Sequence, residues 1–431
     1  MHRAARILMY SQDSYGLGHL RRATNLANAL VAEDPDLSVL LVVDSPVAPF
    51  FDLGDHVDFV KLPTIVKVDA GVFKPGRLLT SASLVKTIRS KVLREVLQWF
   101  DPDLILVDHM PGGANGDLIP ALRQTRLLHD RAKVVLGVRD IIDEPSVTCA
   151  VWEREGYYDT LKRYYDAVLI YGSADVFPTA ERYRIDEAMN GSVQYCGYVC
   201  NMNPVKSRRL IRATIGVGKE PLVAVVAGGG ADAYELMHTY LDAVPLVNRT
   251  QPASTVLVTG PFMPETARKA VRDRANAVGV RVETAVGDGL AFVNAADLVV
   301  SMAGYNTLSE ILRFRKPAIV VPRLGPSAEQ RMRSTIFAER GLISLVNPED
   351  LSPARLASAI VEALSKGTSP NPRRVPVLRG VSTATRALLQ LLATANPRHR
   401  VPPKRRTIRR VTGAMDFERD LRELQSTGPG R

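Results

Sequence analysis

The chain has 431 residues, of which 46% are hydrophobic and 23% charged, and a formal net charge of +11. This length exceeds that of a typical single domain, and the composition allows each of two or three domains to bury a core. Aromatic residues make up 6% of the chain, which argues against an aromatic stacking platform, so no nucleic-acid partner is expected. Three cysteines are too few for a disulfide framework or a convincing metal site.

The sequence contains no uncharged apolar run of about 18 residues and no signal-peptide pattern at its start. We therefore expect a cytoplasmic protein. Residues 396–431 carry clustered cations and prolines, which cannot build a core, so we expect a flexible basic tail. This tail is a candidate contact for an anionic membrane surface, which would hold the protein at the inner face of the membrane. A solvated tail is the alternative.

The first patterned segment predicts the opening of a βαβ unit. Residues 6–11 predict a strand, residues 20–31 predict a helix, and Gly16 and Gly18 allow a tight loop between them. His19 then lies at the mouth of the loop, where a neutral imidazole can act as a general base. A capping or packed histidine is the alternative, and local sequence favours neither.

Further strands are predicted at residues 39–43, 57–62, 104–107, 134–138 and 168–171, with a long helix at residues 81–100. His109 follows one of these strands, and Arg139 and Asp140 follow the next. Because the carboxyl ends of parallel strands meet at one edge of a sheet, we expect these side chains to lie near His19. The Asp-x-Asp pair at Asp101 and Asp103 precedes a strand and reads as a helix-to-strand turn, so no metal is expected there.

A polar stretch at residues 201–209 separates this half from a second α/β series. Its strands are predicted at residues 222–227, 255–259, 280–285, 298–302 and 318–322. Gly228, Gly229 and Gly230 follow the first of these strands and precede a helix, so backbone amides there could approach a phosphate closely.

Residues 297–310 read as a strand, a turn at Gly304 and a helix whose first turn contains Asn306 and Thr307. The free amides of a helix start attract anions. Glu310 lies three residues beyond Thr307 on the same helix face, where a carboxylate suits ribose hydroxyls. The alternative for Glu310 is a solvated residue that complements the helix dipole.

Glu329 and Gln330 lie at the next junction between a loop and a helix. Paired polar side chains at that point could bind sugar hydroxyls. A solvated helix start is the alternative.

Five features of the sequence occur together: two tandem α/β halves, Gly-Leu-Gly-His at residues 16–19, three glycines at 228–230, Gly-x-x-Thr-x-x-Glu at 304–310 and Glu-Gln at 329–330. In this combination the chain resembles the GT-B glycosyltransferases, and glycosyltransferase family 28 in particular. The resemblance covers about residues 4–395. It implies an α/β fold of two doubly wound Rossmann-like domains that face an interdomain cleft. The expected ranges are 1–200 for the acceptor domain, 201–209 for a linker, 210–395 for the nucleotide-sugar domain and 396–431 for the tail.

The resemblance also implies residue roles. The donor would be held by a set of second-half residues: the diphosphate by Gly228, Gly229, Gly230 and Gly304, the ribose by Glu310, the sugar by Glu329 and Gln330, and the base by backbone near Val286. Asn306 and Thr307 belong to the same site. Gly16, Gly18, His109 and Arg139 are the acceptor-side candidates, and either His19 or Asp140 would be the base.

The implied activity is metal-independent, inverting transfer from a nucleotide sugar, with uridine favoured as the base. No cofactor other than this co-substrate is expected. The acceptor stays open, a lipid-linked hydroxyl being one candidate. Because His19 and Arg22 also fit the Gly-x-Gly-His-x-x-Arg form of a nucleotide-sugar hydrolase, hydrolysis is the alternative reaction, and a non-catalytic nucleotide-sugar-binding protein is a third possibility.

Overall fold

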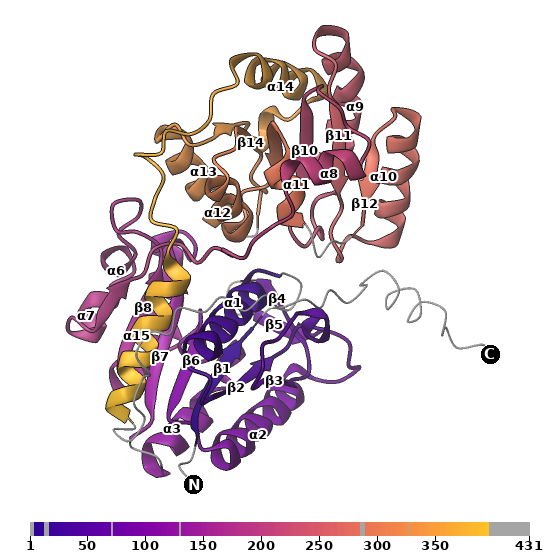
Figure 1. Ribbon diagram of the computed structural model, residues 1–431. Helices are drawn as coiled ribbons and strands as arrows, with labels where there is room; N and C mark the ends of the chain where they lie inside the picture. The colour runs from indigo at the N-terminus through magenta and orange to yellow at the C-terminus, as the bar shows by residue number, and fades with distance from the viewer. Residues whose placement is uncertain are drawn as a thin grey trace.

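The computed structural model describes residues 4–12, 17–69, 72–128, 131–284, 289–325 and 327–395, with backbone alone at residues 67–69 and 72. Gly16, Val286 and the tail at residues 396–431 lie outside this set. Each half of the chain forms a parallel sheet with helices around it, and the two halves meet through loops and helix ends (Figure 1).

The first sheet has seven parallel strands in the order β3-β2-β1-β6-β7-β8-β9. Its strands are β1 (Ala5–Ser11), β2 (Leu37–Val43), β3 (Val57–Lys61), β6 (Leu104–Asp108), β7 (Lys133–Arg139), β8 (Ala167–Tyr171) and β9 (Val193–Tyr195). The central strands are runs of Val, Ile and Leu buried on both faces, as a covered parallel sheet requires. The strand order reverses direction at β1 and β6, which opens a crevice at their carboxyl ends.

The second sheet has six parallel strands in the order β12-β11-β10-β13-β14-β15. Its strands are β10 (Leu222–Val226), β11 (Ser254–Val258), β12 (Arg281–Glu283), β13 (Leu298–Ser301), β14 (Ala318–Val320) and β15 (Ser344–Leu345). Here the order reverses at β10 and β13. The two expected Rossmann-like sheets are therefore present, each with its own switch point.

Helices connect the strands. Those of the first half are α1 (Gly18–Glu33), α2 (Ala82–Phe100), α3 (Ile119–Leu128), α4 (Pro145–Arg154), α5 (Tyr157–Tyr164), α6 (Thr179–Arg182) and α7 (Ile185–Met189). Those of the second half are α8 (Arg208–Thr214), α9 (Tyr234–Thr250), α10 (Glu265–Ala277), α11 (Gly289–Ala295), α12 (Tyr305–Arg313), α13 (Glu329–Glu339), α14 (Pro353–Lys366) and α15 (Gly380–Ala395). Within the described residues, none of these helices is both long enough and apolar enough to span a bilayer.

The last helix, α15, corrects the expected domain ranges. Residues 380–395 were assigned to the second domain, but α15 packs against α1 and the first sheet (Figure 1). Ala384, Leu388 and Leu392 are fully buried there. The chain therefore returns to the first domain at its end, because the apolar face of α15 covers a face of that sheet. The other domain boundaries stay a prediction.

A two-stranded hairpin, β4 (Ile65–Asp69) and β5 (Val72–Pro75), was not predicted from the sequence. Ile65 and Phe73 pack with Val85 of α2 and with Ala114, which lies in the loop after β6. The hairpin therefore lies beside the carboxyl edge of the first sheet.

Tyr305, the first residue of α12, joins the two domains. Its hydroxyl donates to the carbonyl of Tyr171 at 2.8 Å and accepts from the amide of Val199 at 2.7 Å. The guanidinium groups of Arg22 and Arg333 each lie 5.6 Å from the centre of its ring. Tyr305 thus fixes the start of α12 against the first domain.

Candidate active site between the two sheets

His19 lies in the first turn of α1, directly after the loop that leaves β1. Its Nδ1 atom lies 2.5 Å from Oδ2 of Asp108, the last residue of β6. Because β1 and β6 are neighbours at the switch point, the two side chains meet at the open edge of the sheet. The His19 side chain keeps 17% of its surface exposed, so the ring reaches the crevice.

Arg22 fixes the carboxylate of Asp108. Its Nη2 atom lies 2.7 Å from Oδ1 and 2.9 Å from Oδ2, and its Nε donates to Oδ1 at 3.1 Å. Burial alone would raise the pKa of Asp108, but the charge of Arg22 and the hydrogen bonds from His19 and Arg22 outweigh it and hold that pKa below its ordinary value. Asp108 is therefore an ionised acceptor at neutral pH.

This arrangement indicates which nitrogen of His19 carries the proton. An ionised carboxylate can only accept, so the short contact fits a proton on Nδ1 that is donated to Asp108. Nη2 of Arg22 also lies 2.9 Å from Nδ1. A guanidinium nitrogen can only donate, and a protonated Nδ1 cannot accept, so this contact is not a hydrogen bond. A proton on Nδ1 makes Nε2 the ring nitrogen with a lone pair that can take a proton.

His109 follows Asp108 with a φ of 75°, a left-handed conformation that is uncommon outside glycine, asparagine, aspartate and histidine. Its amide donates to the carbonyl of Gly137 at 2.7 Å. Its ring centre lies 5.1 Å from that of His19. This turn thus brings a second imidazole close to that of His19, as the sequence predicts.

The three glycines after β10 form a tight turn against the end of β11. A side chain on Gly230 would place its Cβ 1.8 Å from the carbonyl oxygen of Thr259, so glycine is required there by packing. Gly228 has a φ of 59°, and its Cβ would lie 3.7 Å from Oγ1 of Thr307 without a clash. Gly228 therefore borders the start of α12, while the role of the glycines toward a phosphate stays a prediction.

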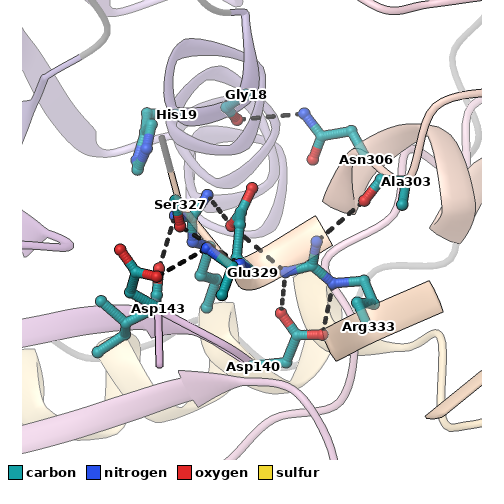
Figure 2. A network of polar contacts seen from close by, with 12 residues as sticks. Gly18, His19, Asp140, Asp143, Ala303, Asn306, Ser327, Glu329 and Arg333 are labelled. Carbon is teal, nitrogen blue, oxygen red and sulfur yellow. Dashed lines mark hydrogen bonds and ion pairs between the residues drawn. The ribbon is translucent and has the colours of Figure 1, made fainter. Parts of the chain in front are cut away.

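The start of α12 points from the end of β13 toward α1. Gly304 is the N-cap and supplies no capping side chain, and the first internal helix bond begins at the amide of Leu308. The amides of the first turn are therefore available to an anion. Asn306 donates from Nδ2 to the carbonyl of Gly18 at 3.2 Å (Figure 2), which joins this helix start to the loop of His19.

Glu310 lies one turn along α12 and is 7% exposed. Arg21 of α1 donates to its Oε1 at 3.2 Å across the domain boundary. Burial raises the pKa of Glu310, and the charges of Arg21 and Arg313 oppose that rise. The solvated alternative is therefore wrong for this residue, while its role toward a ribose stays a prediction.

Asp140 lies in a buried ion pair with Arg333 of α13. Nε and Nη2 of Arg333 donate to the two carboxylate oxygens at 2.9 and 2.7 Å (Figure 2). The hydroxyl of Tyr198 donates to Oδ2 at 3.1 Å. Asp140 is 1% exposed and Arg333 is fully buried. An acceptor hydroxyl has no access to this carboxylate, so the geometry favours His19 over Asp140 as the base and gives Asp140 a structural role between the domains.

Glu329 and Arg139 also meet across this boundary. Nη1 of Arg139 lies 2.6 Å from Oε2 of Glu329, whose side chain is 4% exposed. Arg323 and Arg333 approach the same carboxylate at 3.6 Å each. Gln330 accepts from the amide of Arg323 at 3.3 Å. A solvated helix start is therefore wrong for this pair, and Arg139 lies against the donor-side domain instead of facing an acceptor.

The structure thus places His19 beside His109, Gly18 beside Asn306 and Gly228 beside Thr307, near the boundary between the two domains. Asp108 was not predicted as a site residue, although an aspartate directly after the strand predicted at residues 104–107 is a usable signal. No group of three or more His, Cys, Asp or Glu side chains is arranged to hold a metal ion within the residues that the structure describes.

Comparisons with known proteins bear on the family and the fold of the chain. The model of the glycosyltransferase family 28 C-terminal domain matches residues 223–379. A UDP-N-acetylglucosamine–N-acetylmuramyl-(pentapeptide) pyrophosphoryl-undecaprenol N-acetylglucosamine transferase from Bacillus cytotoxicus is 23% identical over 265 residues, which are 61% of this chain and 68% of the relative. The enzyme of the same name from Bacteroides fragilis is 22% identical over 333 residues, or 74% and 77% of the two chains.

A solved UDP-glucosyltransferase from Polygonum tinctorium superposes with a TM-score of 0.60 at 16% identity, over 91% of this chain and 98% of that one. At this identity the likeness establishes the fold alone. The two sheets and their mutual placement are those of the GT-B architecture.

Proposed function

Because this chain is a family 28-like glycosyltransferase with the GT-B fold, we propose that it transfers a sugar from a UDP-linked donor to an acceptor hydroxyl with inversion and without a metal ion. The observation that carries the proposal is the His19–Asp108 pair at the start of α1, where Asn306 from the uncapped start of α12 donates to the carbonyl of Gly18, the residue before His19. Relatives named for UDP-sugars support the choice of donor.

In the proposed reaction, Nε2 of His19 takes the proton of the acceptor hydroxyl while the oxygen attacks the anomeric carbon. The bond from that carbon to the diphosphate breaks on the opposite side, and its electron pair leaves with the nucleotide, so the configuration inverts. Asp108 is a positioning residue, because it holds the proton on Nδ1 and favours the imidazolium that forms.

The negative charge that grows on the diphosphate needs stabilisation. Five arginines in the crevice already face acidic partners: Arg21 faces Glu310, Arg22 faces Asp108, Arg333 faces Asp140, and Arg139 and Arg323 face Glu329. The stabilising groups are therefore the amides of the first turn of α12, the hydroxyl of Thr307 and the turn at Gly228. Preorganised dipoles of this kind do not require a cation.

The acceptor domain supports a partly apolar acceptor, which includes the lipid-linked class. Leu78, Leu79 and Leu84 are 51%, 106% and 49% exposed beside the hairpin, near the exposed cations Lys74 and Arg77. Phe73 of the hairpin is buried against α2, so it does not belong to this exposed surface. Exposed leucines among cations suit a substrate that is presented at a membrane surface, and this would hold the protein at the inner face of the membrane.

The test is nucleotide release from a panel of nucleotide sugars, measured with and without lipid extract and with and without EDTA. The proposal expects slow release alone, at least tenfold faster release with acceptor, and no loss in EDTA. Fast release of nucleotide without acceptor, at a rate that no lipid extract changes, would indicate that the protein is a hydrolase. Donor binding without any release would make the protein a non-catalytic binder.

A further inference from the structure

A cavity of about 330 Å³ lies at the opposite edge of the second sheet from the proposed donor site. It is lined by residues that precede strands, namely Pro221 before β10, Asp297 before β13 and Pro317 before β14. The donor-side glycines follow the same strands. Since the five residues of β10 span about 16 Å at roughly 3.3 Å per residue, the cavity and the donor site are separate.

Cationic side chains dominate the lining. Arg208, Lys219, Arg315 and Lys316 contribute to it, and Asp297 is its one carboxylate. Asp297 is already engaged, because its oxygens accept from Arg208 at 2.6 Å and from Arg212 at 3.1 Å. It also accepts from the amide of Leu222 at 2.9 Å.

The other cationic side chains of the cavity are bonded to neutral groups or have no partner within the described residues. Nζ of Lys316 donates to the carbonyl of Ala296 at 2.8 Å, and Arg208 donates to the same oxygen at 3.0 Å. The side chains of Lys219 and Arg315 have no hydrogen-bond or ion-pair partner within the described residues. The ends of α12 and α14 also lie here, and each helix end carries about half a negative charge. These partial charges are too small to balance the cavity.

Two features of the end of α12 accompany this concentration of charge. Arg315 has a φ of 49°, a position after a helix that normally takes glycine. Lys316 is half-buried, and burial together with the charge of Arg208 lowers its pKa to about 8, with Asp297 opposing. An anion in the cavity would relieve this electrostatic cost.

We propose that this cavity binds the phosphate of a small phosphorylated ligand, with Lys219, Arg315 and Lys316 around the phosphate. Phe314, Pro221 and Leu364 form the apolar part of the wall and would contact the rest of the ligand. The volume lies in the range of small-molecule sites. A soluble phosphorylated metabolite and a phospholipid headgroup share this chemistry.

The test uses the full chain and titrates inorganic phosphate by calorimetry. The double variant Lys219→Gln/Arg315→Gly removes two cations, and glycine suits the left-handed backbone at residue 315, so its melting temperature without phosphate should equal or exceed that of the wild type. The expected result is at least a tenfold rise in Kd for phosphate. Thr307→Ala, at the start of α12, is the matched control and should keep this binding.

Unchanged phosphate affinity in the double variant would overturn the proposal, and so would loss of the binding in Thr307→Ala alone, because the anion would then lie at the donor site. Flotation on phosphatidylglycerol vesicles identifies the source. Lower recovery of the double variant than of the wild type indicates a headgroup, and equal recovery together with lost phosphate binding indicates a soluble ligand.

Discussion

Nδ1 of His19 lies 2.5 Å from Oδ2 of Asp108, and this contact joins the first helix of the chain to the end of β6. In the proposed mechanism, His19→Ala should lower kcat by about 10²- to 10⁴-fold, the usual contribution of a general base. The KM for the donor should change little, because the donor is assigned to the other domain. Initial rates over a grid of donor and acceptor concentrations measure both constants.

His109→Asn is the matched control for His19→Ala, since asparagine tolerates a φ of 75° and the neighbouring imidazole is left intact. It should raise the KM for the acceptor with a smaller effect on kcat. Equal losses of kcat in the two variants would remove the special role assigned to His19.

The location of His19 could be predicted because a strand, a glycine loop and a helix follow one another directly in the chain. Its pairing with Asp108 could not, since that depends on β1 lying beside β6. The chain passes through β2, β3, a hairpin and α2 between these two strands, and nothing local to either segment encodes their adjacency. Arg22 was likewise visible as a motif residue, but not as a ligand of Asp108.

The contacts of Asp140 and of α15 could not be predicted from the sequence either. An aspartate after a strand has the right chemistry for a base, but its partner Arg333 is 193 residues away and in the other domain. The helical pattern of residues 380–395 predicts an apolar face without indicating which sheet it covers. Sequence periodicity thus establishes the elements and the two sheets, whereas contacts between distant segments decide which polar residues stay available for chemistry.

The buried pair of Asp140 and Arg333 predicts a large effect on stability. Asp140→Ala should lower the free energy of unfolding by about 3–5 kcal/mol, because Arg333 would remain buried and unpaired. The double variant Asp140→Ala/Arg333→Met should lose less than the sum of the single variants. Urea unfolding measures each value.

Arg340 and Asp175 form an exposed ion pair across the same domain boundary, with 28% and 67% of their side chains exposed. Arg340→Met should therefore cost less than about 1 kcal/mol. If Asp140→Ala had an equally small effect, the pair would not hold the domains together.

Glu310 predicts a dependence of stability on pH. Its ordinary pKa is 4.5, and burial raises it in the folded protein, with Arg21 and Arg313 opposing. The folded state therefore binds more protons than the unfolded state between the two pKa values, and the free energy of unfolding falls as pH rises through that window. Glu310→Gln cannot ionise, so its stability should increase relative to the wild type as pH rises above 4.5.

The same variant tests function, because the carboxylate is assigned to ribose hydroxyls. A charged hydrogen bond contributes roughly 1.5–3 kcal/mol, so Glu310→Gln should weaken donor binding about tenfold or more in calorimetry. Glu265→Gln, at an exposed helix start, is the control for both measurements and should follow the wild type. If Glu310→Gln and the wild type showed parallel curves of stability against pH and equal affinity for the donor, both roles assigned to Glu310 would be contradicted.

The exposed leucines beside the hairpin predict selectivity for the acceptor. Leu78→Ser/Leu79→Ser should raise the KM for a long-chain lipid-linked acceptor and leave the KM for a short-chain analogue unchanged, because only the long chain can bury that surface. Leu127→Ser is the control, since Leu127 is 75% exposed on α3. Equal effects on both acceptors would mean that these leucines do not contact the lipid.

The end of the chain predicts two different outcomes for two truncations. Deleting residues 396–431 should leave the melting temperature nearly unchanged, because the prolines and clustered cations of that segment cannot contribute a core. Deleting residues 380–431 also removes α15, whose buried Ala384, Leu388 and Leu392 pack on the first sheet. That longer deletion should abolish cooperative unfolding, since each buried leucine alone is worth about 2–5 kcal/mol on truncation to alanine. Circular dichroism during heating separates the two cases, and Leu391→Ala, on the partly buried side of α15, is a milder control. A longer deletion that melted like the wild type would show that α15 is dispensable to the first domain.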